Sequence, residues 1–231
     1  MTDSSNQQVR ATIVGSLPKP GWLAERGAMF PRWRLEGELL AEGKEDAVRI
    51  WTHAQERAGL DVVTDGEQRR QHYIWGFFQG VSGIDTTRLG KRPQRGQRYH
   101  KEIDAARLVA EPTYHGPIFV DALKATLAMT DRPVKVTLPG PMTIVDSLID
   151  EVGGRSEAAL AMRFAELLNQ EARALEAAGA AVIQFDEPCF NVDVDKVREW
   201  GMATLEVCLA ILQSAKERRE MMMRHQTPML D

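Results

Sequence analysis

The chain has 231 residues, with 29 lysines and arginines against 33 aspartates and glutamates, and a formal net charge of −4. A chain of this length can bury the core of one domain without disulfide support. The near balance of charge argues against a nucleic acid or an anionic membrane as partner, so we expect a small-molecule ligand.

The cysteines and the hydropathy indicate a reducing, cytoplasmic setting. Cys189 and Cys208 have no Cys-x-x-Cys spacing, and no apolar stretch reaches the roughly 18 residues of a membrane span. Residues 1–10 form a polar tail that lacks the apolar segment of a secretion signal.

Two strands are expected in the first third of the chain. The first, at 11–14, ends in Gly15 and Ser16, and a later helix from about 36 to 58 stops at a glycine. The second, at 61–64, ends in Asp-Gly-Glu and is followed by a short helix with three aromatic residues.

Residues 81–115 are polar and basic and are interrupted by glycines and a proline. We interpret them as an excursion with β character that includes a third strand near 107–110. A helix at about 117–129 leads back to a fourth strand at 134–138, and the Pro-Gly-Pro sequence after it is expected to open a ligand-facing loop.

A helix with one apolar face follows and ends at Gly179; this face consists of Leu160, Phe164, Leu167, Leu168 and Leu175. The fifth strand, at 181–185, is apolar enough to be buried on both faces and leads into Asp186, Glu187 and Pro188. A last helix is expected from about 195 to beyond 214.

This alternation of strands and helices predicts an α/β fold of about five β/α units. Three of the strand ends carry small or acidic residues, and α/β barrels keep their chemistry at the C-terminal ends of their strands. The pattern therefore predicts a ligand site at one rim of the sheet.

Four short motifs lie at these strand ends: Val14-Gly15-Ser16, Asp65-Gly66-Glu67, Leu138-Pro139-Gly140-Pro141-Met142-Thr143 and Asp186-Glu187-Pro188. In order and spacing, over residues 11 to about 212, they resemble the catalytic C-terminal domain of cobalamin-independent methionine synthase and its shorter archaeal and bacterial relatives. The resemblance implies a TIM (β/α)8 barrel of the methionine synthase and uroporphyrinogen decarboxylase type, here an incomplete barrel of about five units.

The resemblance also implies methyl transfer to the thiolate of homocysteine, as in 5-methyltetrahydropteroyltriglutamate-homocysteine S-methyltransferase. Carboxylates hold an amino acid's ammonium, and backbone amides and hydroxyls hold its carboxylate. By the resemblance, Gly15 and Ser16 contact the substrate carboxylate, and Glu67 and Asp186 face its amine. The residues alone equally suit a turn cap at Ser16 and local hydrogen bonds at Asp186.

The family uses zinc and no cobalamin, and its zinc ligands are a His-x-Cys pair, a glutamate and another cysteine on later strands. This sequence has none of these positions, and its histidines and two cysteines lack ligand spacing, so we expect no metal site and assign no catalytic residue. Residues 213–231 diverge from the family pattern. The chain is therefore interpreted as one partial barrel domain over 1–231, truncated, frame-shifted or naturally short.

Some features have two interpretations. Cys189 and His72 suit either substrate contact or a structural role, which we favour. A basic set suits either the acidic tail of a folate polyglutamate or, as we favour, a solvated hairpin face; it consists of Arg88, Lys91, Arg92, Arg95, Arg98 and Lys101.

The function itself has alternatives. The chain could be a catalytically inactive remnant that binds an amino acid or a folate, or a uroporphyrinogen-decarboxylase-like barrel. The sequence leaves open whether the methyl donor is a folate, a corrinoid protein or another carrier.

Overall fold

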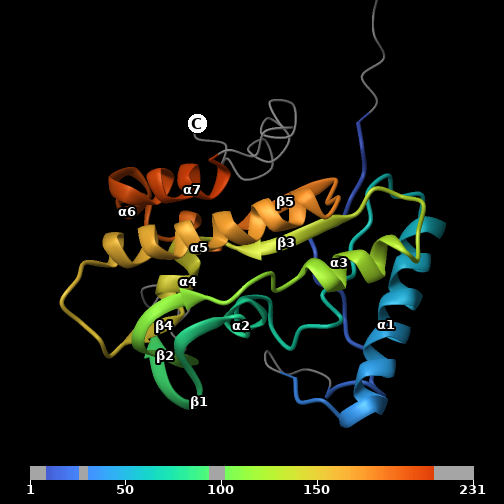
Figure 1. Ribbon diagram of the computed structural model, residues 1–231, viewed down its shortest axis with the longest axis horizontal. Coiled ribbons are helices and arrows are strands. Elements are labelled where there is room, and N and C mark those ends of the chain that lie inside the picture. The colour runs from blue at the N-terminus through green and yellow to red at the C-terminus, as the bar shows by residue number, and fades with distance from the viewer. Residues whose placement is uncertain (1–8, 26–30, 94–101, 211–231) are drawn as a thin grey trace, which may run out of the picture.

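The computed structural model describes residues 9–25, 31–93 and 102–210, and Figure 1 shows how their helices and strands are arranged. The fold is mixed α/β. One sheet has the strand order β1-β2-β4, and the other pairs β3 with β5. The strands are β1 (Val81–Pro93), β2 (Glu102–Tyr114), β3 (Lys135–Pro139), β4 (Leu148–Asp150) and β5 (Val182–Asp186).

Helices separate and cover these strands. In Figure 1, α5 lies alongside β3 and β5, and α7 lies on the other side of α5. The helices are α1 (Gly37–Arg57), α2 (Tyr73–Phe78), α3 (Val120–Leu127), α4 (Pro141–Asp146), α5 (Glu157–Ala177), the 3-10 turn η1 (Pro188–Asn191), α6 (Val194–Lys196), the π-helical turn η2 (Val197–Gly201) and α7 (Met202–Leu209).

α1 begins and ends within one residue of the predicted bounds, and α5 ends just before the predicted Gly179. Gly59 follows α1 with a φ of 80°, and Gly179 follows α5 with a φ of 97°; both are left-handed conformations that glycine adopts without a steric penalty. At the start of α5, the Ser156 hydroxyl accepts a hydrogen bond from the Ala159 amide at 3.2 Å. The apolar face predicted for α5 is buried as a whole, so this prediction is confirmed.

The prediction of strands at 11–14 and 61–64 is wrong, because neither segment forms the repeated hydrogen bonds of a β-strand. Residues 11–14 form no β-ladder; the Ala11 carbonyl accepts from the Asp61 amide at 3.0 Å and from the Val62 amide at 3.3 Å. Residues 61–64 join the second sheet only through an isolated parallel bridge between Val63 and Val134. Both segments lie beside the sheet without the repeated hydrogen bonds that define a strand.

The third strand expected at 107–110 is confirmed as part of β2, which pairs antiparallel with β1 along most of its length and parallel with β4 at Ala106–Leu108. Two 13-residue strands joined by a short connection pair locally. At Gly83, with a φ of 86°, a Cβ atom would lie 2.7 Å from the Ala110 carbonyl oxygen, so the ladder requires glycine there. The β character predicted for 81–115 is confirmed, and within the described residues the strands form no closed barrel.

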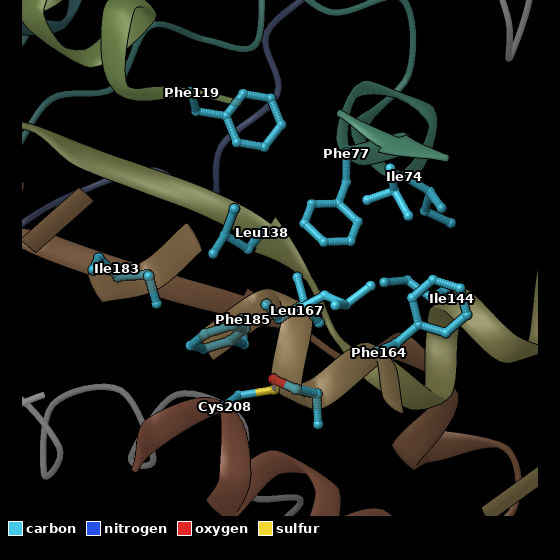
Figure 2. Packing of buried hydrophobic residues seen from close by; sticks show 14 of the residues in the cluster. Ile74, Phe77, Phe119, Leu138, Ile144, Phe164, Leu167, Ile183, Phe185 and Cys208 are labelled. Atoms are coloured by element: carbon cyan, nitrogen blue, oxygen red, sulfur yellow. Dashed lines mark hydrogen bonds between the residues drawn. The ribbon is translucent and has the colours of Figure 1, made fainter. Parts of the chain in front are cut away.

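The fourth and fifth predicted strands are confirmed as the parallel pair β3 and β5, displaced by about one residue. The expectation that the fifth strand is buried on both faces is wrong. Ile183 and Phe185 are buried toward α5, whereas alternate residues, including Gln184 and Asp186, are only partly buried on the opposite face. Figure 2 shows the apolar face, where Leu138, Phe185 and Phe164 pack together.

Two further expectations are corrected. The Pro-Gly-Pro sequence does not open a loop, because Pro141 is the first residue of α4. The last predicted helix is broken into α6, η2 and α7, and its expected extension beyond 214 lies outside the described residues. The tail at 213–231 and residues 1–8 of the N-terminal tail also lie outside the described residues. No helix within the described ranges is long and apolar enough to cross a membrane.

Candidate functional site

The Asp65-Gly66-Glu67 turn places one carboxylate inside the molecule. Glu67 is buried and adopts a φ of 57°, a left-handed conformation that is unfavourable for a residue with a side chain. The turn is held by the Asp65 carboxylate, which accepts from the Glu67 amide at 2.9 Å, and by the Thr64 hydroxyl, which accepts from the Gly66 amide at 2.8 Å. The surrounding hydrogen bonds therefore fix an otherwise strained Glu67.

The Glu67 side chain faces Thr137 on β3 and the backbone at Gly15. The Thr137 hydroxyl donates to Glu67 Oε1 at 2.7 Å. A Cβ atom built on Gly15 would lie 3.1 Å from Glu67 Oε1 and 2.8 Å from Thr137 Cγ2. Gly15 is thus packed directly against the Glu67 carboxylate, and Ser16, the next residue, is exposed.

Asp186, at the end of β5, lies beside the same segment. The Gln184 side-chain amide donates to Asp186 Oδ1 at 2.6 Å and to the Val14 carbonyl at 3.0 Å. Burial raises the pKa of Asp186 to about 6, the Gln184 hydrogen bond opposes the shift, and the Glu67 carboxylate adds to it. Gln184 thus connects Asp186 to Val14, the residue before Gly15, and Gly15 in turn packs against Glu67.

The structure therefore brings Gly15, Glu67 and Asp186 together from three separate segments, with Ser16 at the exposed edge. Two acids beside a turn with a buried glycine and an exposed serine can hold a cation on one side and an anion on the other. This arrangement suits a zwitterion such as an amino acid.

Glu187, adjacent to Asp186, has a different role. Its carboxylate accepts from the Met142 amide at 2.7 Å, the Thr143 amide at 2.9 Å and the Thr143 hydroxyl at 2.6 Å. A Cβ atom on Gly140 would lie 2.1 Å from Glu187 Cδ, so the glycine leaves room for this contact. Burial raises the pKa of Glu187 to about 7, while the three hydrogen bonds favour the charged form. Glu187 joins β5 to the start of α4.

His72 and Cys189 have structural positions. His72 Nδ1 accepts from the Ile74 amide at 3.3 Å and caps α2, and burial lowers the pKa of His72 to about 4. Because an accepting nitrogen must be unprotonated, the lowered pKa and the cap agree. Cys189 is buried next to Met142 and Phe190.

The described members of the basic set face acidic partners of the same chain. Arg88 pairs with Asp85 and Glu151, and Lys91 donates to Asp104 at 2.6 Å. The charges of Arg88 and Lys91 are thus already matched within the protein, and Arg92 lies 3.8 Å from the Glu157 carboxylate, in agreement with the solvated-face interpretation. Arg95, Arg98 and Lys101 lie outside the described residues.

A metal ion has no evident place in the described part of the chain. Residues 9–25, 31–93 and 102–210 contain no group of three or more His, Cys, Asp or Glu side chains arranged to hold one. Both cysteines are free and buried. These residues do not fit the zinc of the family that the motifs resemble.

Three polar residues next to the site were missed in the sequence. Lys135, Thr137 and Gln184 lie on the same face of β3 and β5 as Asp186. Their signal was the alternation of polar and apolar residues in the sequences VKVTLP and VIQFD, which marks a strand with one polar face.

Comparison with known proteins gives one family. The family described as "Cobalamin-independent synthase, Catalytic domain" matches residues 9–212. Curated methionine synthases from Sulfurisphaera tokodaii and Thermococcus kodakarensis are 33% and 32% identical to the chain, over 83% and 80% of its length. The matches cover 55% and 54% of those proteins, so the chain spans about half the length of these relatives.

Solved structures give the same result. A B12-independent methionine synthase from Shewanella sp. W3-18-1, in complex with selenomethionine, matches 87% of this chain and 58% of its own, with 42% identity and a TM-score of 0.82. A protein from Listeria monocytogenes described as a putative vitamin-B12-independent methionine synthase shares the fold, with a TM-score of 0.64 at 16% identity.

Proposed function

Because the chain belongs to the cobalamin-independent methionine synthase family, we propose that it carries the amino-acid site of an S-methyltransferase of methionine biosynthesis, which methylates the thiolate of homocysteine. The observation that carries the proposal is the pair of carboxylates, Glu67 and Asp186, beside the Gly15-Ser16 turn. The Shewanella relative supports it, because the selenomethionine of that complex is an amino acid with the same zwitterionic end.

In this proposal, Glu67 and Asp186 hold the substrate ammonium, while the backbone at Gly15 and the hydroxyl of Ser16 receive its carboxylate. Two carboxylates whose charges repel each other gain from a cation placed between them, and the buried setting strengthens that attraction. Holding both ends of the amino acid fixes the direction of its side chain. These residues would thus position the sulfur for attack, the step that requires a thiolate.

The proposal also covers the complete fold, the methyl donor and the cellular setting. We propose a TIM barrel of which the described strands are part, a methylated folate or another methyl carrier as donor, and a cytoplasmic setting. No step is assigned to zinc, because the described residues do not fit it.

Isothermal titration of the 231-residue chain with L-methionine tests the proposed site. We expect binding, and binding at least about tenfold weaker for 4-(methylthio)butanoate, which lacks the ammonium, because about 1.4 kcal/mol corresponds to a factor of ten. L-homocysteine should compete with methionine.

A matched pair of variants locates the site. Glu67→Gln should weaken methionine binding by at least about tenfold, whereas Glu166→Gln, at an exposed position on α5, should leave it unchanged. Equal affinity for the acid and the amino acid, or equal loss in both variants, would reject the proposal.

A further inference from the structure

A row of polar side chains leads along the polar face of the second sheet, the face opposite Ile183 and Phe185, to Asp186. It begins with Lys135, which is 3% exposed at the start of β3. The Lys135 ammonium donates to the Ile13 carbonyl and to Gln184 Oε1, the latter at 2.8 Å. Within the described residues no carboxylate lies within 4.0 Å of it, so two neutral oxygens and no direct counter-ion hold this buried cation.

Lys135 determines which way the Gln184 amide points. An ammonium has only donors, so the Gln184 atom that faces it must be the carbonyl oxygen. The Gln184 amino group must then face the other way, where it donates to Asp186 Oδ1 at 2.6 Å and to the Val14 carbonyl at 3.0 Å. All three contacts of the Gln184 side chain are satisfied in this orientation, and a flipped amide would place its amino group against Lys135.

The row also affects the charge of Asp186. Burial favours the protonated acid, and the Gln184 hydrogen bond and the positive charge of Lys135 both favour the carboxylate. Burial in turn lowers the pKa of Lys135 to about 8, and Asp186 opposes that shift. Each group thus stabilises the charged form of the other across one glutamine.

We propose that Lys135 is a positioning residue that acts through Gln184, fixing the amide so that Asp186 presents an ionised and oriented carboxylate to the ammonium of the substrate. The inference rests on the proposed function for the identity of the cation. The hydrogen-bonded row itself can be tested without any ligand. A purely structural Lys135, required only to satisfy the Ile13 carbonyl, would leave the ionisation of Asp186 unaffected.

The experiment is a carbon-13 NMR titration of the Asp186 carboxyl group in the full chain, assigned with Asp186→Asn. Lys135→Met removes the ammonium charge and Gln184→Met removes the amide, and both keep an unbranched side chain of similar volume. In both variants the pKa of Asp186 should rise by about one unit, since each loses a contact that favours the carboxylate. Lys124→Met, at an exposed position on α3, is the matched control and should leave it unchanged.

The wild-type chain gives a second readout that needs no variant. If Gln184 donates to Asp186, the side-chain amide resonances of Gln184 must shift with the same midpoint as the Asp186 carboxyl group. Thermal unfolding identifies variants that do not fold. If neither variant folds, the midpoint of the Gln184 amide shift in the wild-type chain tests the inference. An unchanged pKa in a folded Lys135→Met or Gln184→Met, or a Gln184 amide that does not follow Asp186, overturns the inference.

Ligand binding separates the inference from the proposed function. At pH 6 a rise of one unit reduces the ionised fraction of Asp186 from about one half to about one tenth, so methionine affinity should fall about fivefold in the two variants. If the wild type binds no amino acid, the proposed function fails and the NMR titration still decides the role of Lys135. If the wild type binds methionine and the Asp186 pKa is insensitive to both substitutions, only the inference fails.

Discussion

The two faces of the sheet formed by β3 and β5 differ in what they contribute. One face carries Leu138, Ile183 and Phe185 into the core against α5. The other carries Lys135, Gln184 and Asp186, and burial disfavours the charged forms of Lys135 and Asp186. Apolar burial stabilises a fold, whereas desolvation of a charge costs stability. The comparison indicates that the apolar face holds the sheet in place, and the cost of the buried charges on the polar face agrees with the binding role that we propose for it.

The largest expected effect is on the apolar face. Leu138→Ala should lower the free energy of unfolding by about 2–5 kcal/mol, because Leu138 is completely buried and its truncation leaves a cavity. Chemical denaturation measures the loss. A loss below about 1 kcal/mol would show that this face is not the principal support of the sheet.

The second substitution lies on the polar face and should increase the free energy of unfolding, whereas the first should lower it. The pKa of Asp186 is about 6, above the ordinary 3.8, so the folded chain binds a proton more tightly than the unfolded chain between these values. Stability therefore falls as the pH rises from about 4 to about 6. Asp186→Asn removes that cost and should raise the free energy of unfolding at pH 8 by roughly 1–3 kcal/mol.

The same variant supplies its own control, because at pH 4 the wild-type acid is protonated and the difference should almost vanish. Denaturation curves at both pH values check this. Destabilisation at pH 8 would mean that Asp186 stabilises the fold and would remove the contrast between the two faces.

The third substitution tests how closely the first segment packs against the polar face. Gly15→Ala should cost about 1–3 kcal/mol, because its Cβ atom would lie 2.8 Å from Thr137 Cγ2. Adding Thr137→Ser removes that methyl group, keeps the hydroxyl that donates to Glu67, and should restore most of the loss. Thr137→Ser alone should cost only about 1 kcal/mol. No recovery in the double variant would place the strain of Gly15→Ala elsewhere.

The sequence predicted the elements whose signals are local. The ends of α1 and α5 follow from glycines in left-handed conformations, and the buried face of α5 follows from a long helical periodicity. The strand at 107–110 was predicted, but its antiparallel pairing with β1 was not, because periodicity identifies a strand and not its partner.

Prediction of the site was limited by strand length. β5 has five residues, so each face shows only two or three, and its apolar residues concealed the polar face that includes Gln184. Gly15, Glu67 and Asp186 could be named because they belong to the short motifs that resemble the family. The different roles of Asp186 and Glu187 could not be predicted, since only the folded chain shows that Glu187 accepts a hydrogen bond from the start of α4.

The pH dependence of amino-acid binding tests the central claim most directly, namely that Asp186 on the polar face supplies the charge that holds a substrate ammonium. With a pKa of about 6, its ionised fraction increases about tenfold between pH 5 and pH 7. Isothermal titration with L-methionine should therefore show about tenfold tighter binding at pH 7 than at pH 5 in the wild type. In Asp186→Asn, which keeps Glu67 and Glu187, affinity should be weak and nearly independent of pH. The same pH dependence in both proteins, or none in the wild type, would contradict the account.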